Sequence, residues 1–331
     1  MLDTVLIMAL PASGKSEVRR YLDGLTPTQC VGDFKIGPTL QLDDYPYVHF
    51  MHRIDDELAK RGQEYIFYKG PDRPFKEPFE WGTLIEMLNE DYDDLLNRRV
   101  FDVPSTAQLM FDRLDGARKR AGLVPKLGDV PYQVRCQMAD ALESECAEEL
   151  ARKNEVCAQD RSGKTIFIEL ARGGANGSAF PLTPPSGYEF ALSRFSSTIL
   201  DKASILYVWV TPEDSRRKNI ERARPDGQGS ILHHSVPMEV MLGDYGCDDI
   251  DWLISQSGKP DTIKHERLVE ATNADGQACY QLKSWLIPIG RFDNRDDLTS
   301  FIRKDRSDWD DAEVNAIHSG LKQAFDKLAG M

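Results

Sequence analysis

A segment near the start of the chain combines the residue types that bind nucleotide phosphates. Residues 9–16 read ALPASGKS, follow an apolar run and precede a helix-like stretch. This order of strand, tight loop and helix start is the context that a phosphate-binding P-loop requires. Backbone N–H groups of the loop and of the helix N-terminus would point at one position and favour an anion there.

The positions of this loop have distinct expected roles. The backbone at Ala12, Ser13 and Gly14 is predicted to contact phosphate oxygens. Lys15 would supply a point charge to the β- and γ-phosphates, and the Ser16 hydroxyl would hold a Mg²⁺ ion.

The first position of the loop departs from the usual pattern. Ala9 stands where a glycine is usual, and its methyl group is tolerable if the local φ angle is negative. The alternative interpretation is an ordinary buried strand followed by a chance Ser-Gly-Lys-Ser turn.

Two adjacent carboxylates follow the second β-like run. A carboxylate at the end of an interior strand, beside a P-loop, is well placed to orient or deprotonate an attacking hydroxyl. We expect Asp44 to act on the acceptor and Asp43 to lie nearer the metal or Ser16. The alternative is that this Asp-Asp-Tyr-Pro sequence starts a turn, for which Asp and Pro are favoured.

The third β-like run also ends in an acid. Glu169 has the position of a Walker B carboxylate and is predicted to bind Mg²⁺ through water, while Arg172 would approach a phosphate or the acceptor. The alternative is that Glu169 merely ends the strand and that the following Gly-Gly pair is a loop hinge.

Several arginines lie in a helix that starts after the fourth β-like run and in the loop beyond it. Arg216, Arg222 and Arg224 are predicted to spread the charge that develops on a transferring γ-phosphoryl group. Arg217 is assigned to nucleotide binding, since one of these arginines could stack on an adenine ring. Its alternative is a surface role, because glutamates lie four residues before and after it.

Two further features concern the same end of the sheet. Asn294, which follows the proposed fifth strand, is predicted to contact adenine. His233 and His234 have no carboxylate or cysteine at ligand spacing, so we interpret them as surface residues of a lid and not as metal ligands.

The elements that would position these residues alternate between strands and helices. Nearly continuous apolar runs of this kind are typical of strands buried on both faces of a parallel sheet, and helical segments separate them, so the fold class is α/β and doubly wound. Residues 263–289 have the features of a hairpin, with a turn around 273–276. The predicted strands are 4–10, 39–42, 165–170, 204–210 and 285–289, and the predicted helices include 49–61, 80–98, 131–160 and 309–328.

Composition limits the function classes. The 331 residues carry a formal net charge of −13, which disfavours duplex nucleic acid as a partner. The six cysteines form no C-x-x-C pair and indicate reduced thiols in a cytoplasmic protein. No apolar run approaches the length of a membrane span, and the N-terminal run lacks the basic residues of a signal peptide, so we expect no membrane association.

On the strength of these residues the chain resembles the P-loop kinase family, which includes nucleotide-kinase-like and small-molecule kinases and the zeta-toxin-like and polynucleotide-kinase-like branches. The resemblance is carried by residues 9–16, by the acids at 43–44 and by the arginines of 216–224. It implies ATP and Mg²⁺, a mainly parallel five-stranded P-loop NTPase sheet in the order 2-3-1-4-5, and γ-phosphoryl transfer to a bound acceptor. Residues 169–172 depart from the Asp-Gly-x-Pro-Arg of nucleoside monophosphate kinases, which argues against a standard nucleotide kinase.

The sequence therefore predicts an ATP-dependent kinase that acts on a hydroxyl of a small-molecule or nucleotide acceptor. Its core would comprise residues 1–45 and 161–331, with a lid near 211–236, and residues 46–160 would form a helical insertion that binds the acceptor. Three alternatives stay open: a nucleotide-binding NTPase or regulatory module without an acceptor, a non-catalytic binding protein whose phosphate loop has decayed at Ala9, and a polynucleotide kinase. The identity of the acceptor and the oligomeric state are not predicted.

Overall fold

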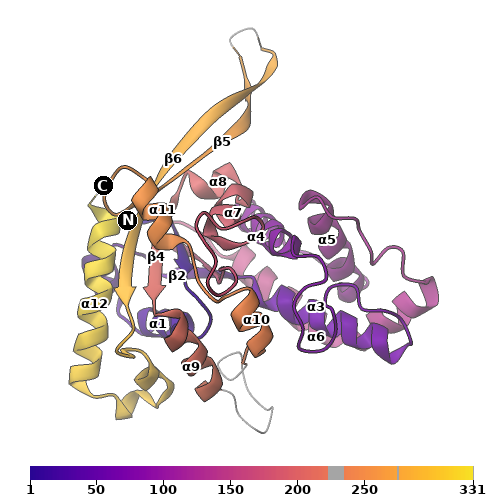
Figure 1. Cartoon of the computed structure of the whole chain (residues 1–331), viewed down its shortest axis with the longest axis horizontal. Coiled ribbons are helices and arrows are strands. Elements are labelled where there is room, and N and C mark those ends of the chain that lie inside the picture. Colours follow the sequence, from indigo (N-terminus) through magenta and orange to yellow (C-terminus); the bar gives the residue numbers. More distant parts are fainter. Residues whose placement is uncertain (223–234, 274–275, 331) are drawn as a thin grey trace.

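A six-stranded, mostly parallel sheet forms the centre of the molecule in the computed structural model, which describes residues 1–222, 235–273 and 276–330 (Figure 1). The strand order is β2-β3-β1-β4-β6-β5. Five strands run parallel in the order that the family resemblance implies, whereas β5 pairs antiparallel with β6. The strands are β1 (Thr4–Met8), β2 (Thr39–Asp43), β3 (Thr165–Leu170), β4 (Ala203–Trp209), β5 (Thr262–Thr272) and β6 (Ala278–Asp293).

The prediction of five strands was one too few. The predicted hairpin is present, but both of its arms are strands of the sheet, and β6 is much longer than the predicted run 285–289. Polar residues alternate with apolar ones over most of this hairpin, so it lacks the continuous apolar run that marks the other strands. In Figure 1 the hairpin extends well beyond the rest of the sheet. Its turn residues 274–275 lie outside the described part of the chain.

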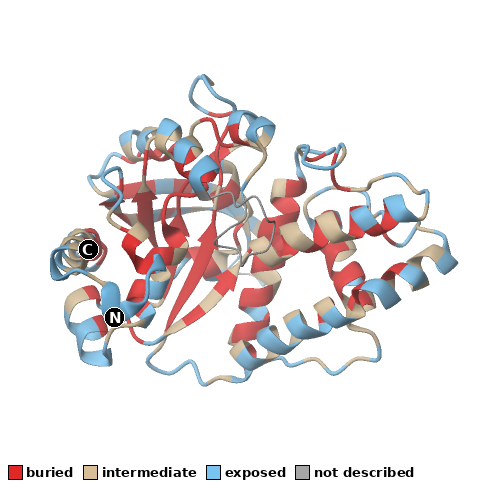
Figure 2. Cartoon of the chain, turned by 90° about the horizontal axis from the view of Figure 1, so that it is seen from below, coloured by how far each residue is buried: buried red, intermediate tan, exposed pale blue. Residues whose placement is uncertain are grey.

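Helices cover both faces of the sheet because successive residues of each strand point to opposite sides. In β1, Leu6 and Met8 pack in one apolar cluster, whereas Val5 and Ile7 pack in another. The first cluster joins the sheet to α4, α7, α8 and α11, and the second joins it to α1 and α12. Figure 2 shows the buried strands between these two layers. The helices are α1 (Lys15–Asp23), α4 (Glu80–Leu96), α7 (Gly187–Arg194), α8 (Ser197–Leu200), α11 (Ile250–Gln256) and α12 (Asp311–Ala329).

The residues between β2 and β3 are helical, as predicted. The expected segments 49–61, 80–98 and 131–160 correspond to α3 (Tyr45–Lys60), α4 and α6 (Tyr132–Ala158), whereas α5 (Thr106–Arg120) was not predicted. Parts of α3, α4, α5 and α6 share an apolar cluster that is separate from the two clusters at the sheet. In Figure 1, α3, α5 and α6 lie beside the sheet and not across its faces.

The shorter elements complete the chain. The remaining helices are α2 (Pro27–Gln29), α9 (Pro212–Arg222) and α10 (Met238–Gly243), and short non-α helical segments cover Cys30–Phe34, Ser300–Arg303 and Arg306–Asp308. All six cysteines are free thiols, in agreement with the sequence-based expectation. Among the described residues, no helix combines the length and the apolar character that crossing a bilayer requires.

His265, on β5, gives the fold a predictable sensitivity to acid. Burial, together with the charge of Arg267, lowers the pKa of His265 from 6.5 to about 4. The unfolded chain therefore binds more protons than the folded chain between these two values, so stability falls as the pH is lowered from 6.5 towards 4.

We expect the His265→Phe variant to depend less steeply on pH in that window, because it removes the group that titrates differently in the two states. Urea denaturation at pH 7 and pH 5 measures this directly. Parallel losses of unfolding free energy in the variant and the parent protein would contradict the assignment.

Candidate active site

The predicted phosphate-binding loop connects the end of β1 to the start of α1. Gly14 occupies the N-cap of α1 in the left-handed conformation, with φ of 97°, and Ala12 also has a positive φ of 55°. Ala9, which stands where the usual pattern has glycine, is fully buried and is not among the described residues with positive φ. Its methyl group is therefore compatible with the backbone, and the departure from the usual pattern creates no strain.

Lys15 folds back over this loop. Its ammonium group donates to the carbonyl oxygens of Ala9 and Leu10 at 3.5 and 3.4 Å. The Ser13 hydroxyl also donates to the Leu10 carbonyl oxygen, at 2.5 Å. The two hydrogen bonds of the Lys15 ammonium are long. A phosphate group would offer the ammonium a charged acceptor in place of these neutral carbonyl groups.

Side chains from distant parts of the chain brace the loop. The side-chain amide of Asn294 donates to the Ser13 carbonyl oxygen at 2.7 Å and to the Thr299 hydroxyl at 2.9 Å. The Ser215 hydroxyl, at the start of α9, donates to the carbonyl oxygen of Pro11 at 2.7 Å. These contacts hold the backbone of the loop in one shape.

Asn294 therefore lies at the loop and is completely buried. The predicted contact between Asn294 and adenine stays a prediction, since the described hydrogen bonds of its side-chain amide go to the loop backbone and to Thr299. The sequence carried no local signal for the brace, because its partners are separated by hundreds of residues.

Gly14 is enclosed by the same brace. A Cβ atom at this position would lie 2.5 Å from the Thr299 hydroxyl oxygen and 2.7 Å from the Asn294 amide nitrogen. A side chain would also be strained by the positive φ. Both effects oppose any residue but glycine here.

We expect Gly14→Ala to lower the unfolding free energy by about 1–3 kcal/mol and to weaken nucleotide binding, since the loop must shift. Gly122→Ala is the matched control, because Gly122 has φ of 87° but no atom within 4 Å of the place that a Cβ would occupy. Urea denaturation of both variants separates the clash from the φ strain. Equal losses in the two variants would show that the brace tolerates a methyl group.

Asp44 and Arg172 form a buried ion pair next to the loop. The Arg172 guanidinium donates to an Asp44 carboxylate oxygen at 2.7 Å, and Arg172 and Asp44 are only 2% and 7% exposed, respectively. The guanidinium carbon lies 5.0 Å from the ring centre of Trp81, at the start of α4. Burial raises the pKa of the Asp44 carboxyl, and the positive charges of Arg172 and Lys15 oppose this rise.

The two residues thus come together as the position of β2 beside β3 requires. The sequence predicts that Arg172 approaches a phosphate or the acceptor, and in the structure its guanidinium also holds the Asp44 carboxylate in one orientation. Tyr188, which was not predicted, connects this pair to the loop: its hydroxyl donates to the Ala9 carbonyl oxygen at 2.9 Å and accepts from the Arg172 backbone N–H at 3.3 Å.

Asp43 and Glu169 lie opposite each other on β2 and β3 and share one guanidinium group. Arg19, on α1, donates to Asp43 at 3.2 Å and to Glu169 at 2.7 Å. Burial raises the pKa of both carboxyls, and the charge of Arg19 opposes both rises. The Asp43 carboxylate raises the pKa of Glu169 further, and the Asp44 carboxylate does the same for Asp43. The sequence did not predict a role for Arg19. Its position on the second turn of α1 places its side chain near the C-terminal ends of β2 and β3.

The residues around Ser16 and Glu169 fit Mg²⁺ only in part. Hydroxyl and carboxylate oxygens suit the ion, and Ser16 is partly exposed on the first turn of α1. Glu169, however, already has the Arg19 guanidinium as its partner, and a cation there would have to compete with it. Within the described ranges, no group of three or more potential ligand side chains could hold a metal ion. We therefore retain Ser16 as the candidate ligand, with phosphate oxygens as the others.

The predicted lid arginines are only partly described. Arg216 pairs with Glu213 at 2.7 Å. Arg217 pairs with Asp214 at 3.2 Å and Glu221 at 3.0 Å, which agrees with the surface alternative for this residue. The side chain of Arg222, and all of Arg224, His233 and His234, lie outside the described part of the chain, so their predicted roles stay predictions.

Comparison with known proteins did not identify a relative. None of the protein-family models compared with the chain matches it. None of the curated proteins or solved structures compared gives a significant match. The functional argument therefore depends on the geometry of the site.

Proposed function

We propose that this protein is an ATP-dependent kinase that transfers the γ-phosphoryl group to a hydroxyl of a small-molecule or nucleotide acceptor. The observation that carries the proposal is the buried carboxylate of Asp44, held by Arg172 beside the loop that contains Lys15. A phosphate-binding loop alone would suit any nucleotide-binding protein. An oriented carboxylate next to it is the additional group that phosphoryl transfer to a hydroxyl uses.

Asp44 would act on the acceptor. The acceptor hydroxyl oxygen forms a bond to the γ-phosphorus, the bond from that phosphorus to the β–γ bridging oxygen breaks, and ADP leaves. The hydroxyl proton passes to Asp44. Burial raises the pKa of this carboxyl and so strengthens it as a base, while Arg172 keeps it ionised and correctly oriented.

Lys15 and the loop would act on ATP. The backbone at Ala12, Ser13 and Gly14 would contact the phosphates, and the ammonium of Lys15 would leave its two carbonyl acceptors for phosphate oxygens. A bound Mg²⁺ would neutralise charge on the β- and γ-phosphates, with Ser16 as its protein ligand. The arginines Arg216, Arg222 and Arg224 are proposed to add positive charge near the γ-phosphate, and Arg217 and Asn294 stay candidates for the nucleotide base.

The helices inserted between β2 and β3 are the proposed acceptor-binding part. Their connection to the site is direct, since α3 begins next to Asp44, and Trp81 of α4 lies against Arg172. A polar acceptor would enter between these helices and the loop. This proposal keeps the predicted division of the chain, with residues 46–160 as the insertion.

The test is a screen of ATP consumption against panels of sugars, nucleosides and oligonucleotides. A kinase gives ADP formation that depends on one acceptor class, and oligonucleotides as that class would identify a polynucleotide kinase. Slow hydrolysis that no acceptor stimulates would instead favour a nucleotide-binding regulatory module. Absence of any ATP binding in calorimetry would reject all three.

A further inference from the structure

An open cavity of about 570 Å³ lies between α4, α7 and β5, away from the phosphate-binding loop. Its size is within the range of small-molecule sites. Three arginines, Arg120, Arg194 and Arg267, line it together with Glu86 and Glu90. The cavity thus carries a local excess of positive charge in a protein whose formal net charge is −13.

The two glutamates are already engaged by guanidinium groups. Arg194 pairs with Glu86 at 2.6 Å, and Arg120 pairs with Glu90 at 2.7 Å. Glu90 also accepts from Arg113, at 2.6 Å. No carboxylate at the cavity is therefore left over for the third arginine.

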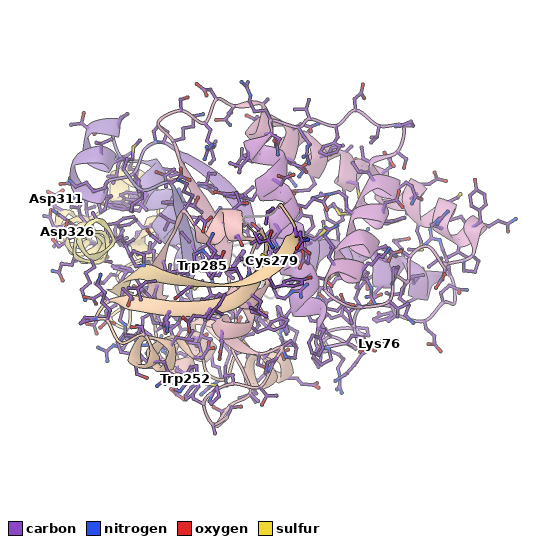
Figure 3. The ribbon with its side chains drawn as sticks, turned by 90° about the horizontal axis from the view of Figure 1, so that it is seen from above. Lys76, Trp252, Cys279, Trp285, Asp311 and Asp326 are labelled. Carbon is purple, nitrogen blue, oxygen red and sulfur yellow. The ribbon has the colours of Figure 1, made fainter. Side chains whose placement is uncertain are left out.

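Arg267 is that third arginine. Among the described residues no carboxylate lies within ion-pair distance of it, and its guanidinium donates instead to the Ser193 carbonyl oxygen at 2.6 Å. The guanidinium carbon is 5.2 Å from the ring centre of Trp285, which supports the group from one side. Figure 3 shows Trp285 on the hairpin that carries Arg267's strand. Burial and the neighbouring charge of Arg194 lower the pKa of Arg267, and the more distant carboxylate of Glu86 opposes this shift only in part.

A second arginine at the cavity also has a hydrogen-bond donor without an acceptor. The Nε of Arg194 is buried and has no hydrogen-bond partner among the described residues. Buried donors without acceptors are costly, and guanidinium groups bind phosphate and carboxylate oxygens with paired hydrogen bonds. An anion with several oxygens would balance the excess positive charge of the cavity and bind the accessible parts of its guanidinium groups, since the side chains of Arg120 and Arg194 are 45% and 29% exposed.

We propose that this cavity binds a small polyanionic molecule, of the size of a di- or triphosphate or a polycarboxylate, at a site distinct from the phosphate-binding loop. The loop follows the C-terminal end of β1. Arg267 of β5 lies opposite Lys283 of β6 in the register of the antiparallel pair. Lys283 precedes the segment of β6 that pairs in parallel with β4, which begins at Ile289. The cavity therefore lies toward the opposite end of the sheet, and one ligand cannot fill both sites.

The test measures binding of inorganic pyrophosphate and, separately, citrate to the Lys15→Ala protein by isothermal titration calorimetry. The Lys15→Ala background weakens binding at the loop, so that the remaining heat reports on the cavity. We expect one of the two anions to bind, and adding Arg267→Ala to raise the dissociation constant at least about tenfold, the cost of one charge-assisted pair. Which anion binds identifies the ligand as phosphorylated or as a polycarboxylate.

Arg306→Ala is the matched control in the same background. Arg306 also lies over an indole ring, that of Trp309, and donates to a backbone carbonyl, but it does not line the cavity. It should leave the affinity unchanged within about twofold. Absence of binding by both anions, or equal losses for Arg267→Ala and Arg306→Ala, would overturn the proposal. Because the assay contains no ATP and measures no turnover, its result is independent of the kinase proposal.

Discussion

The Lys15→Ala variant is expected to lose ATP turnover by about 100-fold or more and to bind ATP more weakly than the parent protein. The ammonium is the one group on the loop that brings a full positive charge to the proposed phosphate site, and it does so from a nearly buried position, 8% exposed. Charges in such sheltered sites are worth much more than charges in water, and removing a single preorganised donor commonly costs a factor of this size. Steady-state ADP formation and calorimetry with ATP measure the two effects.

Lys259→Ala provides the control for this variant. Lys259 is an exposed lysine between α11 and β5, outside the proposed acceptor-binding helices, so its loss alters the net charge equally but leaves the loop intact. It should keep turnover within about twofold, as is usual for exposed positions. Turnover like that of the parent protein in Lys15→Ala would mean that the loop does not serve ATP chemistry at all.

The second large effect is expected for Asp44→Asn. The amide keeps the shape of the carboxylate but cannot accept a proton, so phosphoryl transfer should fall by about 10²–10⁴-fold. ATP affinity should change by less than about threefold, because the proposed contacts to ATP come from the loop and not from Asp44. Rapid-quench measurement of transfer and calorimetric measurement of binding distinguish the two quantities.

A merely structural role for Asp44 makes a different prediction. The substitution leaves the buried guanidinium of Arg172 without its charge partner, so the unfolding free energy of the variant must be measured in parallel. If Asp44 is the base, the parent protein's rate constant for transfer rises with pH through the raised pKa of this carboxyl, and the variant lacks that rise. Loss of ATP binding together with transfer would instead place Asp44 at the metal or in the scaffold.

The positions of the candidate site residues on the first three parallel strands could be predicted because each residue follows a recognisable local pattern. The loop before Lys15 is contiguous in sequence, and the acids at Asp43, Asp44 and Glu169 end apolar runs. Parallel strands bring their C-terminal ends to one edge of a sheet, so these residues had to lie near one another once the strands were placed correctly. The pairing of β2 with β3 places Asp43 directly opposite Glu169.

The supporting residues could not be predicted in the same way. Asn294 and Thr299 reach the loop from the far end of the chain, and Arg19 acquires its role only when α1 packs beside the ends of β2 and β3. Such contacts depend on tertiary packing and leave no periodic signal in the sequence. Helix α5 was missed because two arginines, Arg113 and Arg118, interrupt the apolar residues on its buried side. β5 was predicted only as an arm of the hairpin and not as a strand of the sheet, because its polar residues alternate with apolar ones.

The most direct test of the central claim follows the γ-phosphate of isotopically labelled ATP. The parent protein, incubated with labelled ATP, Mg²⁺ and the acceptor panel, should transfer the label to a hydroxyl of one acceptor class, and Asp44→Asn should bind ATP without transferring it. Label that appears solely as inorganic phosphate at a rate no acceptor changes, or label that remains in ATP with every acceptor, would contradict the assignment as a kinase.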